Sequence, residues 1–129
     1  MPYLRIECNR ALSDDRVAQL QKELTNLVHE IKGDPVAMIS TVILQSVPVS
    51  FGGDPCEPSC IVTLTNAVMP PATTSALTRA LTAALGASYG VPPNRMYIFF
   101  QQFSDPTLVG WNGVTFDQVI APQKKEGAR

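Results

Sequence analysis

Charged residues are scarce in this sequence of 129 residues. They make up 16% of the chain, and 10 basic against 11 acidic residues leave a net charge of −1, whereas soluble domains usually carry about 25% charged residues. Without a basic surface the chain lacks the electrostatic footprint that nucleic acid requires, which excludes nucleic acid as a partner. Because 45% of the residues are hydrophobic, the low charge favours a folded domain with a protected or oligomeric surface, not disorder.

Long hydrophobic runs and cysteines are also few. No apolar run approaches the roughly 18–20 residues that a membrane span needs, and no basic segment precedes an apolar one at the start. We therefore expect a cytoplasmic protein with no membrane partner. Secretion by a route that needs no signal peptide stays an alternative. Three cysteines, Cys8, Cys56 and Cys60, are too few and odd in number for a secreted disulfide scaffold.

Residues that build metal or cofactor sites are missing as well. The one histidine, His29, falls on the solvent side of a predicted helix, which excludes an imidazole-based triad or metal cluster. Cys56 and Cys60 lack the second ligand pair of a zinc site and the spacing of a redox pair. The Gly52-Gly53 doublet lacks the spacing of a phosphate loop. We expect no metal and no cofactor.

Hydrophobic spacing along the chain predicts four main strands and two helices. Residues 2–8 alternate as a strand, and Ser13 followed by two acids is typical of a helix start. That helix ends at Gly33, because Pro35 forbids its continuation. The remaining elements are strands over residues 38–45, 60–64 and 95–103, a helix over residues 73–89 and a short fifth strand over residues 114–116.

The order of these elements repeats with a period of about 57 residues. It predicts an α+β fold of β-α-β-β-α-β order, in which two helices cover one face of a four-stranded sheet. The strands over 38–45 and 95–103 are apolar on both faces, so the other sheet face must also become buried, most simply by self-association. Length favours a single domain, which we place at residues 1–116, with residues 117–129 as a flexible C-terminal extension.

Pro2 is the residue that points to chemistry. A small residue at position 2 permits removal of the initiator methionine, which would expose a secondary amine. Burial in an apolar pocket lowers the pKa of an amine, and a base that is neutral near pH 7 suits proton transfer at carbon. Taken alone, a proline at position 2 more often only permits removal of the initiator methionine and has no catalytic role.

Several motifs occur together in a fixed order. Met1-Pro2 opens the first strand, Gly33-x-Pro35 follows the first helix, and Phe51-Gly52-Gly53 forms a turn; residues 94–98 (NRMYI) and 109–116 (VGWNGVTF) come later. In this order and spacing the chain resembles the tautomerase superfamily, and within it the macrophage migration inhibitory factor and D-dopachrome tautomerase family. The resemblance covers residues 1–116.

The resemblance implies a homotrimer whose sheets wrap into a barrel, with active sites at subunit interfaces. It implies Pro2 as general base and acid for a keto–enol tautomerase of the phenylpyruvate or dopachrome type. It also implies a small α-keto acid or enol as the substrate. The pocket residues that it implies, with Tyr97 supplied by the neighbouring subunit, are Met38, Ala67, Tyr97, Phe99, Val109 and Phe116.

The sequence departs from the family where substrate charge is decided. The family usually reads G-K-P where this chain reads Gly33-Asp34-Pro35, and that lysine normally pairs with the substrate carboxylate. An aspartate there should repel an anionic substrate, and Lys32 is the nearby cation that could replace the lysine. Phe99 replaces a common asparagine. Two hypotheses follow: a tautomerase with weak activity on α-keto acids, or a cytokine-like protein that binds a receptor with little catalysis.

Overall fold

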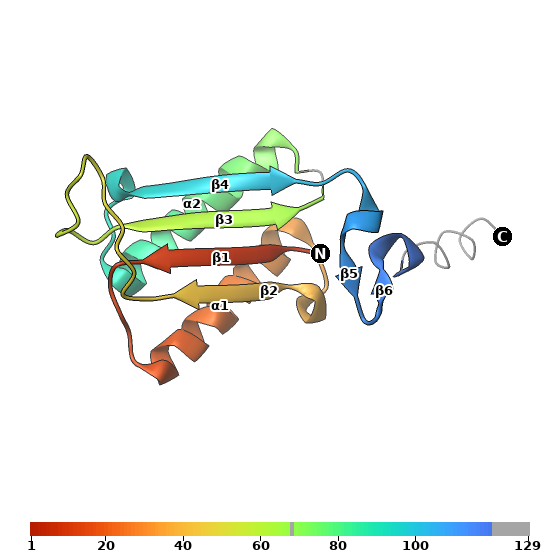
Figure 1. Cartoon of the computed structure of the whole chain (residues 1–129), viewed down its shortest axis with the longest axis horizontal. Coiled ribbons are helices and arrows are strands. Elements are labelled where there is room, and N and C mark those ends of the chain that lie inside the picture. The colour runs from red at the N-terminus through yellow and green to blue at the C-terminus, as the bar shows by residue number, and fades with distance from the viewer. Residues whose placement is uncertain (68, 120–129) are drawn as a thin grey trace.

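Two long helices lie side by side on one face of a four-stranded sheet (Figure 1). The structure is a computed structural model and describes residues 1–67 and 69–119. In chain order its elements are β1 (Tyr3–Cys8), α1 (Asp14–Lys32), β2 (Ser40–Leu44), β3 (Cys60–Asn66), α2 (Pro71–Tyr89), β4 (Met96–Gln102), β5 (Gly110–Trp111) and β6 (Val114–Thr115), with 3₁₀ turns at Val36–Met38, Pro93–Arg95 and Pro106–Leu108.

The sheet has the mixed order β2-β1-β3-β4. β1 runs parallel to β2 and antiparallel to β3, and β3 runs parallel to β4. Two parallel neighbouring strands need a long connection, because a short loop can join only antiparallel strands. Each helix supplies that connection, α1 between β1 and β2 and α2 between β3 and β4. The predicted β-α-β-β-α-β order and the two helices on one face are confirmed.

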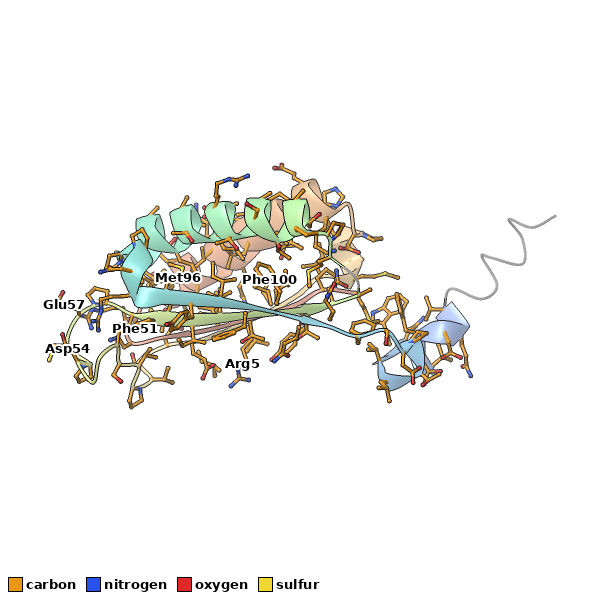
Figure 2. All side chains as sticks on the ribbon, turned by 90° about the horizontal axis from the view of Figure 1, so that it is seen from above. Arg5, Phe51, Asp54, Glu57, Met96 and Phe100 are labelled. Atoms are coloured by element: carbon orange, nitrogen blue, oxygen red, sulfur yellow. The ribbon has the colours of Figure 1, made fainter. Side chains whose placement is uncertain are left out.

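The core lies between this sheet face and the helices. Leu4, Ile6 and Cys8 alternate along β1 and are fully buried, as a strand of period two requires. Figure 2 shows Met96 and Phe100 on the helix side of the sheet and Arg5 on the opposite side. The helices contribute two buried stripes at helical spacing, Leu20, Leu24 and Val28 from α1 and Leu77, Leu81, Leu85 and Tyr89 from α2.

Local chemistry sets the ends of α1. The Ser13 hydroxyl accepts a hydrogen bond from the Arg16 backbone N–H at 3.4 Å, which satisfies one of the free donors of the first turn. Gly33 ends the helix with a left-handed φ of 83°, and its N–H donates to the His29 carbonyl at 2.8 Å. The helix end therefore delivers the chain, through Asp34 and Pro35, to the sheet end where β1 begins.

Several boundaries differ from the prediction, each for a tertiary reason. Met38 lies in a 3₁₀ turn and not in β2, because the turn follows Pro35 directly. β3 continues to Asn66 because β4 pairs with it there. β6 pairs with β5 in a separate two-stranded sheet, and Phe116 begins a helical segment over residues 116–119. The rest of the predicted extension, residues 120–129, lies outside the described residues.

The sheet face away from the helices is uncovered. Pairing aligns its side chains in rows, among them Tyr3 beside Ser40 and Thr65. Tyr97 and Phe99 on β4 are 58% and 52% exposed, and Phe51 stacks on Tyr97 with ring centroids 5.3 Å apart. Large aromatic side chains on an open face are typical of an interaction surface. Among residues 1–67 and 69–119, no helix combines the length and apolarity needed to cross a bilayer.

The burial of the cysteines gives a direct test of this core. Cys8 and Cys60 pair across β1 and β3 and are buried, whereas Cys56 is exposed. Burial raises the pKa of the Cys8 thiol and raises that of Cys60 to about 12. We expect a thiol reagent at neutral pH to modify Cys56 rapidly and the other two only after unfolding, as followed by mass spectrometry. Rapid modification of Cys60 in the folded chain would contradict this core.

Candidate active site

A cavity of about 420 Å³ opens at the sheet end where β1 begins. β3 ends there because it runs antiparallel to β1, and the β5–β6 hairpin folds beside it (Figure 1). The cavity wall is mainly apolar, with aromatic residues contributed from β1 and from the segment after β4. The lining residues are Met1, Pro2, Tyr3, Met38, Ser40, Thr65, Phe103, Leu108, Val109, Gly110 and Trp111.

Pro2 is held in this wall by the sheet. It is buried, and its carbonyl accepts a hydrogen bond from the Ser40 N–H at 3.0 Å. This bond extends the pairing of β1 with β2 to the residue before β1. In the chain described, Met1 acylates the Pro2 nitrogen, so this nitrogen carries neither a proton nor a basic lone pair.

The Met1 amine lies beside the cavity among polar groups. It donates to Asn66 Oδ1 at 3.1 Å and is 3.8 Å from Asp34 Oδ1. Burial lowers the pKa of this amine from its usual value, Asp34 opposes that shift, and Lys32 adds to it. Burial therefore outweighs the Asp34 charge and shifts the amine toward its neutral form relative to a solvent-exposed terminus.

Lys32 and Asp34 form an ion pair next to the amine. Lys32 Nζ lies 3.5 Å from Asp34 Oδ2, and the Lys32 side chain is only 9% exposed. Asp34 Oδ2 is buried and accepts no hydrogen bond from any residue that the structure describes. The Lys32 charge is thus directed at Asp34, and the two charges largely cancel at this edge of the cavity.

The other residues predicted for the site fall into two groups. Met38 and Val109 line the cavity with Pro2. Phe116 is half-buried and its N–H donates to the Val109 carbonyl at 2.7 Å, and Ala67 is exposed directly after Asn66. Tyr97 and Phe99 do not line it.

Tyr97 and Phe99 lie on the uncovered sheet face. Tyr97 pairs with Ile61, which is close to the start of β3, whereas the cavity is at the end of β3. Within one chain these two rings therefore do not share the cavity with Pro2.

Sequence reasoning missed several cavity residues. Tyr3, Ser40 and Thr65 are neighbours across three strands, and only the strand register, which the pattern alone does not supply, brings them together. Trp111 belongs to the motif over residues 109–116 that carries the family resemblance, but no role in the site was predicted for it. The polar partner of the terminal amine, Asn66, lies beyond the strand predicted over residues 60–64, so the local pattern did not mark it.

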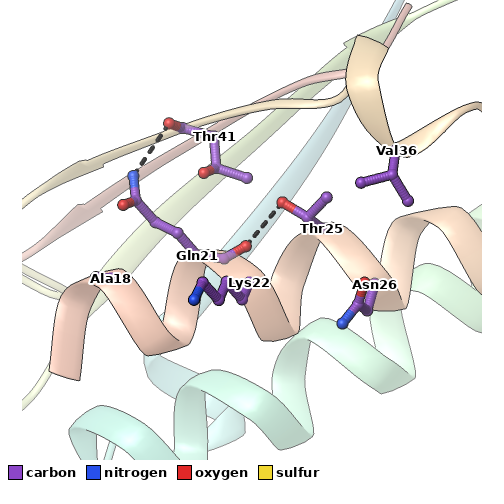
Figure 3. A pocket seen from close by; sticks show the side chains of 7 residues that line it. All are labelled: Ala18, Gln21, Lys22, Thr25, Asn26, Val36 and Thr41. Carbon is purple, nitrogen blue, oxygen red and sulfur yellow. Dashed lines mark hydrogen bonds between the residues drawn. The ribbon is translucent and has the colours of Figure 1, made fainter. Parts of the chain in front are cut away.

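A second hollow, of about 540 Å³, lies between α1 and the edge strand β2 (Figure 3). Gln21 Nε2 donates to the Thr41 carbonyl across it at 3.3 Å. Its lining holds one titratable side chain, Lys22, so it offers no acid–base pair. The lining residues are Ala18, Gln21, Lys22, Thr25, Asn26, Val36 and Thr41. The described residues also contain no group of three or more His, Cys, Asp or Glu side chains arranged for a metal ion.

Comparison with known proteins accounts for this architecture. The sequence profile of the macrophage migration inhibitory factor (MIF) family matches residues 1–117. The chain belongs to the MIF family. It is 32% identical to the macrophage migration inhibitory factor of Xenopus tropicalis over 118 residues, which cover 90% of this chain and 99% of that protein.

Solved structures of MIF proteins share the fold. The Trichinella spiralis protein is 28% identical with a TM-score of 0.77, covering 88% of this chain and 99% of its own. The homologue from Prochlorococcus marinus is 27% identical with a TM-score of 0.81, covering 88% of this chain and 98% of its own. These matches confirm the family resemblance and extend over most of the chain.

The polar surroundings of the terminal amine can be tested in the MIF-family chain that retains Met1. With methionine labelled at ¹³Cα, the Met1 signal should titrate with a pKa below 8.0, the ordinary value for this amine. Asp34→Asn should lower that pKa further, because it removes the favourable charge, and Lys32→Met should raise it. A pKa at or above 8.0, or no response to either substitution, would contradict this arrangement.

Proposed function

We propose that the chain, once Met1 is removed, is a cofactor-independent keto–enol tautomerase in which Pro2 is the general base and acid. The observation that carries the proposal is the position of Pro2, buried in the wall of a largely apolar cavity at the start of the central strand. Membership of the MIF family supports it. Met1 also lines the cavity, so its removal both enlarges the cavity and frees the Pro2 nitrogen.

The proposed reaction moves one proton between carbon and oxygen. The neutral Pro2 amine takes a proton from the carbon next to the substrate carbonyl, and the electrons of the broken C–H bond form the carbon–carbon double bond of the enol. The Pro2 ammonium formed in this step gives the proton to the carbonyl oxygen, which makes the enol and leaves the amine neutral again. In the reverse reaction Pro2 takes the enol proton from oxygen and returns it to carbon. No cofactor is needed, since the apolar wall favours the neutral amine.

The remaining predicted pocket residues receive roles in the same proposal. Met38, Val109 and Phe116 form the apolar wall around the substrate, and Ala67 leaves the end of β3 open beside Pro2. Lys32 is the cation nearest the site, but its ion pair with Asp34 limits its reach toward a substrate carboxylate.

The proposal includes a homotrimer. The exposed Tyr97 and Phe99 need a cover, and a neighbouring subunit that packs its sheet against this face would place both rings at the neighbour's Pro2. Because about half of each side chain is already covered, burying the rest of each ring would contribute about 1 kcal/mol to the assembly. The active site would then be completed between subunits.

A second candidate function is a cytokine-like protein that binds a protein receptor with little catalysis. The observation that favours it is the ion pair of Lys32 with Asp34, which directs the Lys32 charge away from an anionic substrate. Receptor capture by a Pro2→Gly variant without activity would separate the two functions.

The role of Pro2 is tested by Pro2→Gly in protein whose Met1 is shown by intact mass to be absent. Glycine keeps a free amine but removes the secondary amine and its fixed geometry. We expect tautomerisation of phenylpyruvate or of dopachrome methyl ester to fall at least about tenfold in kcat/KM, with an unchanged melting temperature.

The wild-type amine should also be alkylated by 2-oxo-3-pentynoate, an electrophilic keto acid, at Pro2. Equal rates for wild type and Pro2→Gly, or rates no higher than in buffer, would overturn the tautomerase proposal.

The interface is tested by mixing two impaired variants. Pro2→Gly and Tyr97→Ala chains, co-assembled at random, should form trimers in which about a quarter of the sites combine an intact Pro2 with a neighbour's intact Tyr97. We expect about that share of wild-type activity to return. If Tyr97 served its own subunit, mixing would restore nothing; a solution mass of one 14.0 kDa chain would also contradict the assembly.

A further inference from the structure

The Met1 amine occupies a polar subsite at the edge of the cavity. Asn66, which is 2% exposed, accepts from the amine through Oδ1 at 3.1 Å, and Asp34 Oδ1 lies 3.8 Å away. Both groups present acceptor oxygens to this point. Removal of Met1 takes away this donor and frees the Pro2 amine, whose neutral form has one N–H and can satisfy at most one of the two acceptors. Both acceptors stay, because Asn66 ends β3 and Asp34 follows the fixed end of α1.

The chemistry of these acceptors restricts what can replace the amine. A buried acceptor that loses its donor costs about 1–3 kcal/mol, so a ligand with an N–H or O–H group is favoured here. A carboxylate has no donor at neutral pH and meets the Asp34 charge. Lys32 already lies 3.5 Å from Asp34 Oδ2, so the pair offers little attraction to an anion.

We propose that Asn66 and Asp34 form a subsite for an uncharged, hydrogen-bond-donating end of the substrate, so that the chain prefers α-keto amides to α-keto acids. This rests on the proposed function for the reaction itself, but the binding preference does not depend on catalysis. Asp34 is then the residue that sets substrate charge, and Asn66 the one that orients the donor.

Binding is measured first, without turnover. The chain has one tryptophan, Trp111, and it lines the cavity, so its fluorescence reports occupancy. In protein without Met1, we expect 3-phenylpropanamide to bind at least about tenfold more tightly than 3-phenylpropanoate, which have the same size and differ in charge and donor. Asp34→Asn should reduce this ratio several-fold, and Asp34→Lys should reverse it.

Matched controls keep the result specific. Glu23→Lys makes the same change of charge on an exposed part of α1 and should leave the ratio unchanged, while thermal melting confirms that each variant is folded. Asn66→Ala should weaken binding of the amide more than that of the acid. The proposal is overturned if wild type binds the acid as tightly as the amide, or if Asp34→Lys changes both affinities equally.

Turnover measurements then distinguish the proposed substrate preference from the proposed tautomerase activity. With phenylpyruvamide and phenylpyruvate as substrates, we expect a higher kcat/KM for the amide in wild type and for the acid in Asp34→Lys. Activity that depends on Pro2 but favours the acid would overturn the subsite and leave the tautomerase proposal standing. A preserved binding preference with no activity on either compound would overturn the tautomerase proposal alone.

Discussion

The pairing of β1 on both of its edges is the constraint on which the rest of the structure depends. β2 binds one edge and β3 the other, so the first residues of the chain form the middle of the sheet instead of a loose end. Chain termini are usually poorly ordered unless secondary structure holds them. Here the Ser40 hydrogen bond extends that hold to Pro2, which places the terminal amine at the sheet end, within hydrogen-bond distance of Asn66.

A second consequence is electrostatic. The same sheet end receives Asn66 from β3 and, through the turn after α1, Asp34 with Lys32. An aspartate beside an amine favours the ammonium form, which would weaken a general base, whereas burial and Lys32 act in the opposite direction. The ion pair places a carboxylate beside the amine and still keeps the local charge close to neutral.

The sequence alone could predict the elements and the helix-covered face, because alternation in residues 2–8 and the Gly33 and Pro35 signals depend on local chemistry. It could also predict Pro2, Met38 and Val109 as neighbours, but only through the family resemblance. Strand register and the path after β4 are tertiary properties, so Ser40, Thr65 and Leu108 carried no local signal. The family resemblance showed that Asp34 stands where a lysine is usual. That Asp34 forms an ion pair with Lys32 became visible only in the folded chain.

The cavity is open on one side and the sheet face beside it is uncovered, and a single interface could cover both. Within one chain Pro2 is buried in a wall that is open on one side, while Tyr97 and Phe99 remain exposed near the other end of the sheet. An interface that buries those rings gains apolar contact area, and it can close the open wall at the same time. In such an arrangement a substitution on β4 would alter catalysis and assembly together, although it lies far from Pro2 in its own chain.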